Sequence, residues 1–335
     1  PVQGQETSLI PELLDAMRAT HAMGKQTILF LNRRGFAYFF FCRSCHWEMS
    51  CSHCSVGMTY HKARNIMVCH YCGRVARPIE VCPDCGSLDV GYAGFGTEKV
   101  EEDVGRYFPD LRISRIDTDS IKRKGSLETT ISEFRKGNLD SLPGTQMVAK
   151  GLNFPGVRLV GIVNADMGLH LPDFRAAERT FSLITQVAGR AGRYTDNGLV
   201  IVQTFKPEAP PIRLAVNGSI KEFYDWELDQ RRQQVFPPFS RLIRLVFRSA
   251  SADKASQAAK EFVRNHGAIL NPGCEILGPA ECALARVNNS SRYQILLVTR
   301  QQFGELPDRL EQSLAQWSNP AGVYLEVDTD PVSLL

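Results

Sequence analysis

Eight cysteines, arranged as four Cys-x-x-Cys pairs, constrain this chain more than any other feature. The pairs are Cys42 and Cys45, Cys51 and Cys54, Cys69 and Cys72, and Cys82 and Cys85. Two thiolates separated by two residues can both reach one ion, and four thiolates complete the closed tetrahedron of a structural zinc site. The sequence therefore predicts two zinc ions. A module of roughly 50 residues has little core, so we expect the metal to hold it together.

Other uses of paired cysteines fit the pattern less well. The first ten residues carry no secretion signal, which disfavours a disulfide framework. Iron clusters usually have other spacings, and a redox dithiol needs only one pair. Gly73 and Gly86 each follow the second cysteine of a pair, where a positive φ is often needed. We interpret Cys274 and Cys282 as plain core or surface thiols. Four histidines lie among the paired cysteines and are interpreted as surface residues: His46, His53, His61 and His70.

The net charge of +3 gives no argument for a nucleic-acid partner. Eight metal-bound thiolates and two Zn²⁺ ions would lower it by four, to −1. No run of about 18 apolar residues is present, so we expect no membrane span. With no secretion signal either, the sequence predicts a cytoplasmic protein.

Short apolar runs alternate with helical patterns through the first two thirds of the chain. Strands are expected at 27–31, 112–117, 158–164 and 199–205, and helices at 98–108, 127–136 and about 174–188. Such alternation predicts a doubly wound α/β domain with a parallel sheet, which the cysteine module interrupts as an insertion. A Pro- and Glu-containing linker at 206–211 is expected to close this domain.

The remaining residues follow a different order of elements, β-α-β-β-α-β. This order is the split βαβ arrangement of ferredoxin-like α+β domains. In its first strand, Ile243, Leu245 and Phe247 share one face, whereas Arg244 and Arg248 lie on the other. The two arginines and the segment 292–294 are either a partner surface or solvated strand residues.

Two segments of the α/β part carry sharper chemistry. One is Gly-Thr-Gln-Met-Val-Ala-Lys-Gly-Leu-Asn-Phe-Pro at 144–155, and the other is Gln-Val-Ala-Gly-Arg-Ala-Gly-Arg at 186–193. The second presents Arg190 and Arg193 three residues apart, so that both can converge on a phosphate. A guanidinium that reaches a nucleotide held by another domain is the arginine-finger device.

These segments resemble motifs V and VI of superfamily 2 helicases. The stretch 173–179 leading into 185–193 closely resembles the PriA family, the primosomal protein N′ of bacterial replication restart, and so do the segments 30–36 and 94–98 on either side of the cysteines. The resemblance covers nearly the whole chain. It implies the C-terminal part of an ATP-dependent 3′→5′ DNA helicase that recognises stalled forks and restarts replication by primosome assembly.

The resemblance also implies a division into three parts. Residues 1–35 and 93–211 would form a RecA-like second motor lobe, 36–92 the zinc insertion and 212–335 the C-terminal α+β domain. Partners implied in the same way are forked or single-stranded DNA, single-stranded DNA-binding protein and primosome proteins, with ATP and Mg²⁺ as substrate and cofactor of the full-length enzyme.

Roles carried over from the family are assigned to matching positions. Arg190 and Arg193 would meet the γ-phosphate of ATP, Gly151 would lie near the nucleotide and Gln186 would couple ATP to DNA. Arg33, Arg34, Thr145 and Gln146 would contact DNA. From the residues alone, the zinc sites could use the cysteine pairs in order or nested. The family implies nesting, with the first and fourth pairs on one ion and the second and third on the other.

Departures from the family pattern define what this chain is expected to lack. No G-x-x-x-x-G-K-[ST] segment is present, so the first motor lobe and the N-terminal DNA-binding domain are expected to be missing and the chain alone to be inactive. Asn153 stands where many helicases have Asp, which weakens a ribose contact there. Pro143 precedes motif V, where a strand residue would be usual. The rival hypothesis is a non-catalytic zinc-ribbon adaptor that binds protein or RNA.

Overall fold

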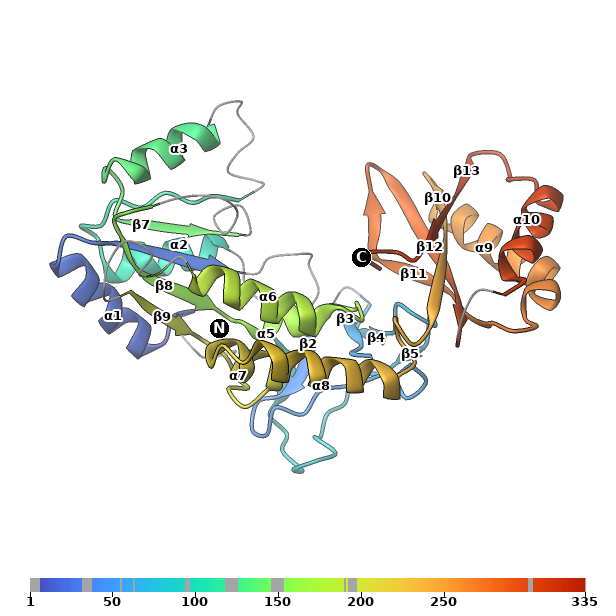
Figure 1. Cartoon of the computed structure of the whole chain (residues 1–335), viewed down its shortest axis with the longest axis horizontal. Coiled ribbons are helices and arrows are strands. Elements are labelled where there is room, and N and C mark those ends of the chain that lie inside the picture. The colour runs from blue at the N-terminus through green and yellow to red at the C-terminus, as the bar shows by residue number, and fades with distance from the viewer. Residues whose placement is uncertain are drawn as a thin grey trace. The chain divides into compact units, whose positions relative to one another are not determined.

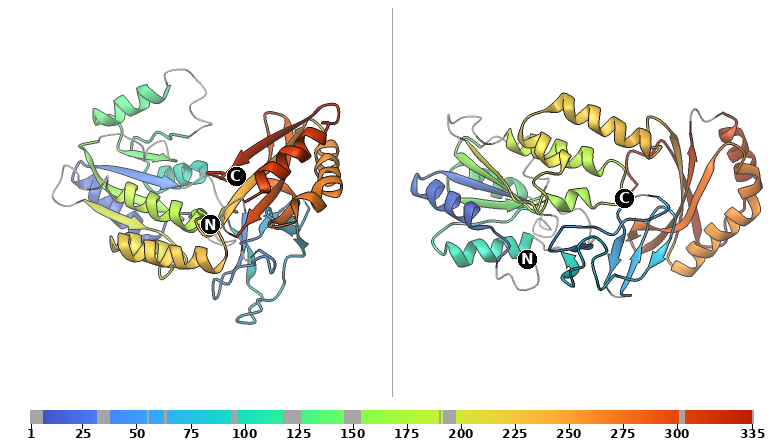
Figure 2. Two further views of the ribbon diagram at one scale, coloured as in Figure 1. Left: turned by 45° about the vertical axis from the view of Figure 1, so that its right-hand side comes forward. Right: turned by 90° about the horizontal axis from the view of Figure 1, so that it is seen from below.

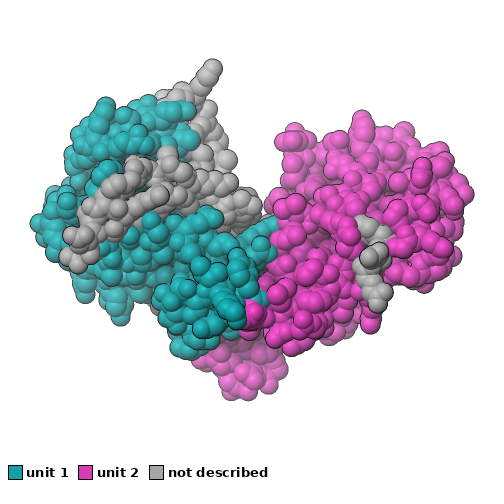
Figure 3. All heavy atoms as spheres, viewed as in Figure 1, with its two compact units in different colours: residues 1–36, 93–170, 176–224 teal, residues 37–92, 171–175, 225–335 magenta. Residues whose placement is uncertain are grey.

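The computed structural model describes residues 7–31, 38–54, 56–62, 64–93, 97–117, 126–145, 154–189, 191, 198–300 and 304–334. The chain divides into two compact units, which Figure 3 shows in teal and magenta. Unit 1 comprises residues 1–36, 93–170 and 176–224, and unit 2 comprises 37–92, 171–175 and 225–335. Contacts therefore group the cysteine module with the C-terminal domain, and they place the change between units after Tyr224.

Unit 1 is built on a parallel sheet (Figure 1). Its strand order is β7 (Ser141–Gly144), β1 (Gln26–Leu31), β8 (Val157–Val163) and β9 (Leu199–Val202). Every residue of β1 is buried, as expected of a central strand covered on both faces. The doubly wound α/β fold predicted from the alternating pattern is present.

Helices supply the layers around this sheet. They are α1 (Pro11–Ala22), α2 (Thr97–Tyr107), α3 (Ser126–Arg135), α5 (Asp166–Leu169), α6 (Ala176–Ala188), α7 (Pro210–Val216) and the first residues of α8 (Ile220–Gln233). Leu13 of α1 and Val100 of α2 share a core cluster with Leu29 and Leu159 of the sheet. Phe181 of α6 stacks on Phe223, with ring centroids 3.9 Å apart.

Three expectations for this unit need correction. The predicted strand 112–117 makes only isolated bridges to β7, at Ile113 and Ile116. Pro143, just before motif V, lies within β7 opposite Leu29, so this position is a strand residue after all. The predicted linker 206–211 contains the start of α7, because prolines at the first positions of a helix have no N–H to lose and begin it readily.

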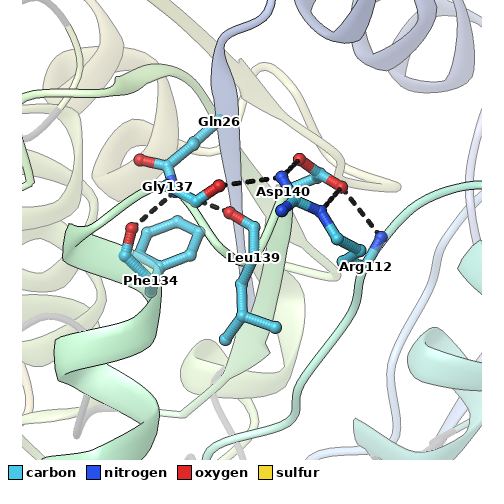
Figure 4. Close-up of polar contacts among 6 residues, drawn as sticks. All are labelled: Gln26, Arg112, Phe134, Gly137, Leu139 and Asp140. Carbon is cyan, nitrogen blue, oxygen red and sulfur yellow. Dashed lines mark hydrogen bonds and ion pairs between the residues drawn. The ribbon is translucent and has the colours of Figure 1, made fainter.

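Polar contacts fix the amino ends of the strands (Figure 4). The Gln26 side chain donates to the backbone oxygens of Phe134 and Leu139, both at 2.6 Å. Arg112 pairs with the Asp140 carboxylate at 2.6 Å. These bonds anchor the turn before β7 at the amino ends of the strands. Ligands of parallel α/β sheets bind at the opposite edge, outside the carboxyl ends of the strands.

Unit 2 contains two sheets. The cysteine module carries five short strands in the order β5 (Val75–Ala76), β4 (Ile66–Val68), β3 (Thr59–His61), β2 (Tyr38–Cys42) and β6 (Val90–Ala93). The C-terminal part contains β10 (Arg241–Ser249), α9 (Ala252–Leu270), β11 (Glu275–Val287), β12 (Ser290–Thr299), α10 (Leu306–Gln316) and β13 (Val323–Thr329). Its antiparallel sheet has the order β11-β12-β10-β13, which confirms the split βαβ prediction.

The two faces of the C-terminal sheet have different partners. Ile243, Leu245 and Phe247 pack against α9 and α10, which cover one face in Figure 2. On the other face, Leu242 and Leu296 join a cluster that includes residues of the cysteine module. The expectation of solvated or partner-binding residues on this second face is therefore wrong for Arg244, which is 4% exposed and donates to Gln294 at 2.6 Å.

Among the described residues, none of the helices combines the length and apolar character needed to cross a membrane.

Candidate metal centre and motor segment

Each cysteine pair lies in a tight backbone turn. The N–H of the first cysteine donates to the carbonyl five residues later, from Cys42 to Trp47, Cys51 to Val56, Cys69 to Arg74 and Cys82 to Ser87, at 2.8–2.9 Å. In three turns the residue after the second cysteine has a positive φ: His46 at 61°, Gly73 at 78° and Gly86 at 72°. The two glycines therefore occupy the conformation expected from the sequence.

The four turns converge in two groups of four thiols. Cys42, Cys45, Cys82 and Cys85 form one group, and Cys51, Cys54, Cys69 and Cys72 form the other, with the sulfur atoms of each group within 4.8 Å of one another. This is the nested grouping that the family resemblance implies. Closing the module with its first and last turns fixes the two ends of the insertion together.

The sulfur separations fit a zinc ion. Sγ atoms of Cys42 and Cys85 lie 3.6 Å apart, as do those of Cys45 and Cys82, and Cys51 and Cys72 are 3.8 Å apart. Four sulfurs about 2.3 Å from a tetrahedral zinc would be about 3.8 Å from one another. A disulfide would need about 2.0 Å, and the eight thiols are free.

The backbone of the turns favours thiolates at some of these positions. Burial opposes ionisation of Cys42, but N–H donors from Cys45 and Ser44 outweigh it and lower the pKa of Cys42 to about 6. A hydrogen bond with Cys54 lowers the pKa of Cys69 to about 5, while the same bond raises that of Cys54. A bound cation supplies the positive charge that all four thiolates of a group share.

One histidine of the module is not the surface residue expected. His70 is 2% exposed, and its Nδ1 donates to the backbone oxygen of Glu281 at 2.8 Å, since a carbonyl can only accept. Its Nε2 lies 3.3 Å from that of His61. Burial lowers the pKa of His70 below its usual value. Cys274 and Cys282 are core thiols, as one of the two sequence interpretations held.

The two thiol groups differ in their surroundings. Cys51 and Cys69 of the second group belong to the core cluster that also contains Leu242 and Leu296 of the C-terminal sheet. Cys85 of the first group is exposed. The second metal site is therefore part of the core that joins the module to the C-terminal domain, which the sequence did not indicate.

Most motor residues assigned from the resemblance lie outside the described residues, namely Arg33, Arg34, Gln146, Gly151, Arg190 and Arg193. Thr145 is described, immediately after β7, with its N–H donating to Ile116 at 3.2 Å. Gln186 is exposed near the end of α6. Thr145 therefore lies at the carboxyl end of β7, and Gln186 lies on α6, which precedes the two arginines in the sequence.

Family models match three stretches of the chain. The Primosomal protein N C-terminal domain matches residues 232–332, the PriA DNA helicase Cys-rich region domain matches 51–77 and the Helicase conserved C-terminal domain matches 97–195. Replication restart protein PriA of Treponema pallidum is 51% identical over 327 residues, which cover 98% of this chain and 50% of that protein. The chain belongs to the PriA family.

Other PriA relatives match over the same extent. The protein of Bacillus subtilis is 37% identical over 99% of this chain and 42% of its own length. That of Borreliella burgdorferi is 34% identical over 99% and 50%. The chain therefore spans about half the length of the curated PriA relatives it matches. It comprises a helicase C-terminal domain, a zinc-binding cysteine module and the PriA C-terminal domain.

Proposed function

We propose that this chain is the second motor lobe, zinc module and C-terminal domain of an ATP-dependent 3′→5′ DNA helicase that recognises stalled forks and restarts replication by primosome assembly. The observation that carries the proposal is the helicase C-terminal model at 97–195, which lies in one chain with the PriA zinc and C-terminal models. A non-catalytic adaptor has no need for a motor lobe, so the rival hypothesis is disfavoured.

In this proposal the lobe supplies half of a split ATPase site. Arg190 and Arg193 contact the γ-phosphate of ATP bound by the first lobe, Gly151 lies near the nucleotide and Gln186 couples the nucleotide to DNA. Stabilising charge that develops during phosphoryl transfer is the established use of such arginines. ATP and Mg²⁺ are held by the first lobe, whose phosphate-loop motif G-x-x-x-x-G-K-[ST] does not occur in this sequence.

DNA is the proposed partner of the same lobe, with Arg33, Arg34, Thr145 and Gln146 as its contacts. Single-stranded DNA-binding protein and primosome proteins are proposed partners of the full-length protein in the cytoplasm. Functionally, we propose 1–35 with 93–211 as the motor lobe, 36–92 as the zinc insertion and 212–335 as the C-terminal domain. Residues 37–92 and 225–335 form one compact unit with residues 171–175, whereas 212–224 belong to the other unit.

Unwinding polarity tests this proposal. The full-length protein is mixed with ATP, Mg²⁺ and duplexes that carry a single-stranded tail at either the 3′ or the 5′ end, and strand displacement is followed by fluorescence. We expect displacement on the 3′-tailed duplex and on forks, and none without ATP. ATP-independent binding with no displacement on any of these substrates would favour the adaptor instead.

A further inference from the structure

A five-residue segment of the motor sequence belongs to the other unit. Leu171–Arg175 groups with unit 2, whereas the residues on both sides, up to His170 and from Ala176, belong to unit 1. The segment directly precedes α6, whose far end leads into the arginine segment 186–193. What holds these five residues therefore bears on where α6 begins.

Asp173 binds the end of the chain. Its carboxylate is 4% exposed. One oxygen accepts from the backbone N–H of Arg175 at 2.9 Å, and the other accepts from the hydroxyl of Ser333 and the N–H of Leu334, both at 3.1 Å. Hydrogen bonds to a buried carboxylate are among the stronger kinds, so this contact fixes the segment to the C-terminal tail.

Arg175 also binds the C-terminal tail. Its NH1 group donates to the backbone oxygens of Pro331 at 3.0 Å and Val332 at 2.7 Å. An aspartate that accepts from 333–334 and an arginine that donates to 331–332 together bind four consecutive tail residues. The tail is thus bound to the residues that directly precede α6.

Phe174, between these two, reaches the zinc module. Its N–H donates to the hydroxyl of Tyr71 at 2.9 Å, and Tyr71 lies between two metal-site cysteines, Cys69 and Cys72. The Phe174 ring stacks on Phe236 at 5.5 Å with an interplanar angle of 21°. One short segment therefore contacts the zinc turn, the residues before the C-terminal sheet and the C-terminal tail.

The helix that follows is packed in the motor lobe. Phe181 and Ile184 of α6 are buried, and the Thr180 hydroxyl donates to the Ala176 carbonyl at 2.9 Å. A 13-residue helix spans about 20 Å. The body of α6 therefore belongs to unit 1, whereas the residues directly before it are held within unit 2.

We propose that Asp173, Phe174 and Arg175 are positioning residues for ATP hydrolysis, because they hold the residues directly before α6, the helix that carries Gln186. This inference rests on the proposed helicase function. None of the three residues touches the nucleotide. Gln186 is the residue proposed above to couple the nucleotide to DNA, so loss of these contacts is expected to lower the stimulation of hydrolysis by DNA.

The test uses the full-length protein and the ratio of DNA-stimulated to DNA-free ATPase. Asp173→Asn keeps the shape but puts an amide N–H₂ against donors from the tail. We expect the ratio to fall at least about fivefold, as allosteric couplings of ordinary size would give. The Kd for forked DNA should change less than about twofold and two zinc ions should be retained. A loss of folded protein alone would lower both rates and leave their ratio unchanged.

A deletion of residues 331–335 gives the second variant, because it removes the tail acceptors and donors without touching the segment. Asp229→Asn is the matched control, since Asp229 forms an exposed pair with Arg232 on α8. Normal ratios in both test variants would overturn the proposal, as would loss of zinc or of DNA binding in both. If the unaltered protein shows no DNA-stimulated ATPase, it is the proposed helicase function that fails.

Discussion

The side chain of Gln294 donates a hydrogen bond to the backbone oxygen of His70 at 2.8 Å, across 224 positions of sequence. Gln294 is 1% exposed, lies on β12 and also accepts from Arg244 at 2.6 Å. His70 follows a metal-site cysteine, so this amide joins the C-terminal sheet to the zinc module. Buried polar bridges of this kind are costly when one partner is removed.

Gln294→Ala is therefore expected to destabilise unit 2 selectively. The His70 carbonyl loses its donor and Arg244 loses an acceptor, at a cost of roughly 1–3 kcal/mol. Hydrogen exchange should show faster exchange in β10 and β12, with α1 and β1 of unit 1 unchanged. Gln257→Ala on α9 is the control, because Gln257 is exposed and its side chain bonds to Glu261 on the same helix. Equal effects of the two substitutions would contradict the role assigned to Gln294.

Cys51→Ser and Cys42→Ser should have different consequences, although each reduces the zinc content from two ions to one. A structural zinc contributes on the order of 10 kcal/mol, comparable with the stability of a whole domain. Cys51 lies in the core shared with the C-terminal sheet, so its loss should expose β12 to exchange as well. Loss of Cys42 should affect mainly the turns around the first site, because Cys85 there is exposed.

Metal analysis with hydrogen exchange checks this pair of variants. Both should leave unit 1 folded, since its core contains no metal-site residue. One zinc per chain in the unaltered protein would refute two sites, and identical exchange in the two variants would refute the distinction between them.

Unit 1 should lose stability in acid through Asp103. Burial opposes ionisation of this carboxylate, but hydrogen bonds from the N–H and hydroxyl of Ser8 and a contact with Lys99 outweigh it and lower its pKa below the ordinary 3.8. Because the folded-state pKa is depressed, the stabilisation is complete above about pH 4 to 5 and is lost as the pH falls through the folded value.

Asp103→Asn removes this acid dependence at a cost of roughly 1–3 kcal/mol at neutral pH. Denaturant melts of unit 1 between pH 3 and about 7 should show the difference between variant and unaltered protein shrinking as the pH falls. Asp15→Asn, which alters an exposed pair with Arg18, is the control. A stability difference between the variant and the unaltered protein that grows as the pH falls would contradict a depressed pKa of Asp103.

The 335-residue chain by itself should not hydrolyse ATP. Hydrolysis needs a phosphate cradle, a Mg²⁺ site and a positioned water, and this sequence has no glycine-rich Lys-Ser/Thr loop. In the full-length protein, Arg193→Ala should lower DNA-stimulated ATPase on the order of 10³-fold and leave DNA binding largely intact. Steady-state phosphate release measures the turnover of the 335-residue chain and of the full-length variant. ATP turnover by the pure 335-residue chain, or normal ATP turnover by the Arg193→Ala protein, would contradict an ATPase site split between two lobes.

Local patterns were predictable from the sequence. The central strand β1 is an uninterrupted apolar run, α9 and α10 show helical spacing, and Gly73 and Gly86 occupy the positive φ that their cysteine turns require. These features depend on residues within a few positions of one another. For the same reason the β-α-β-β-α-β order could be anticipated, because each element carries its own period.

Partnerships between distant residues could not be predicted in the same way. Arg244 alternates with apolar neighbours as an exposed strand residue would, yet it is buried because Gln294 and the zinc module cover that face. The grouping of cysteine pairs was open from spacing alone, since sequential and nested sites use identical turns. His70 has nothing in its local sequence that distinguishes it from His46 or His53.

The sequence by itself determined the elements, the four metal-binding turns and the motor segments, because these follow from backbone geometry and side-chain chemistry over short spans. Only the tertiary structure decided which turns share a metal, which sheet face is buried and that Asp173–Arg175 bind the C-terminal tail. Those outcomes depend on which surfaces exclude water from each other, and periodicity carries no information about a partner more than 150 residues away.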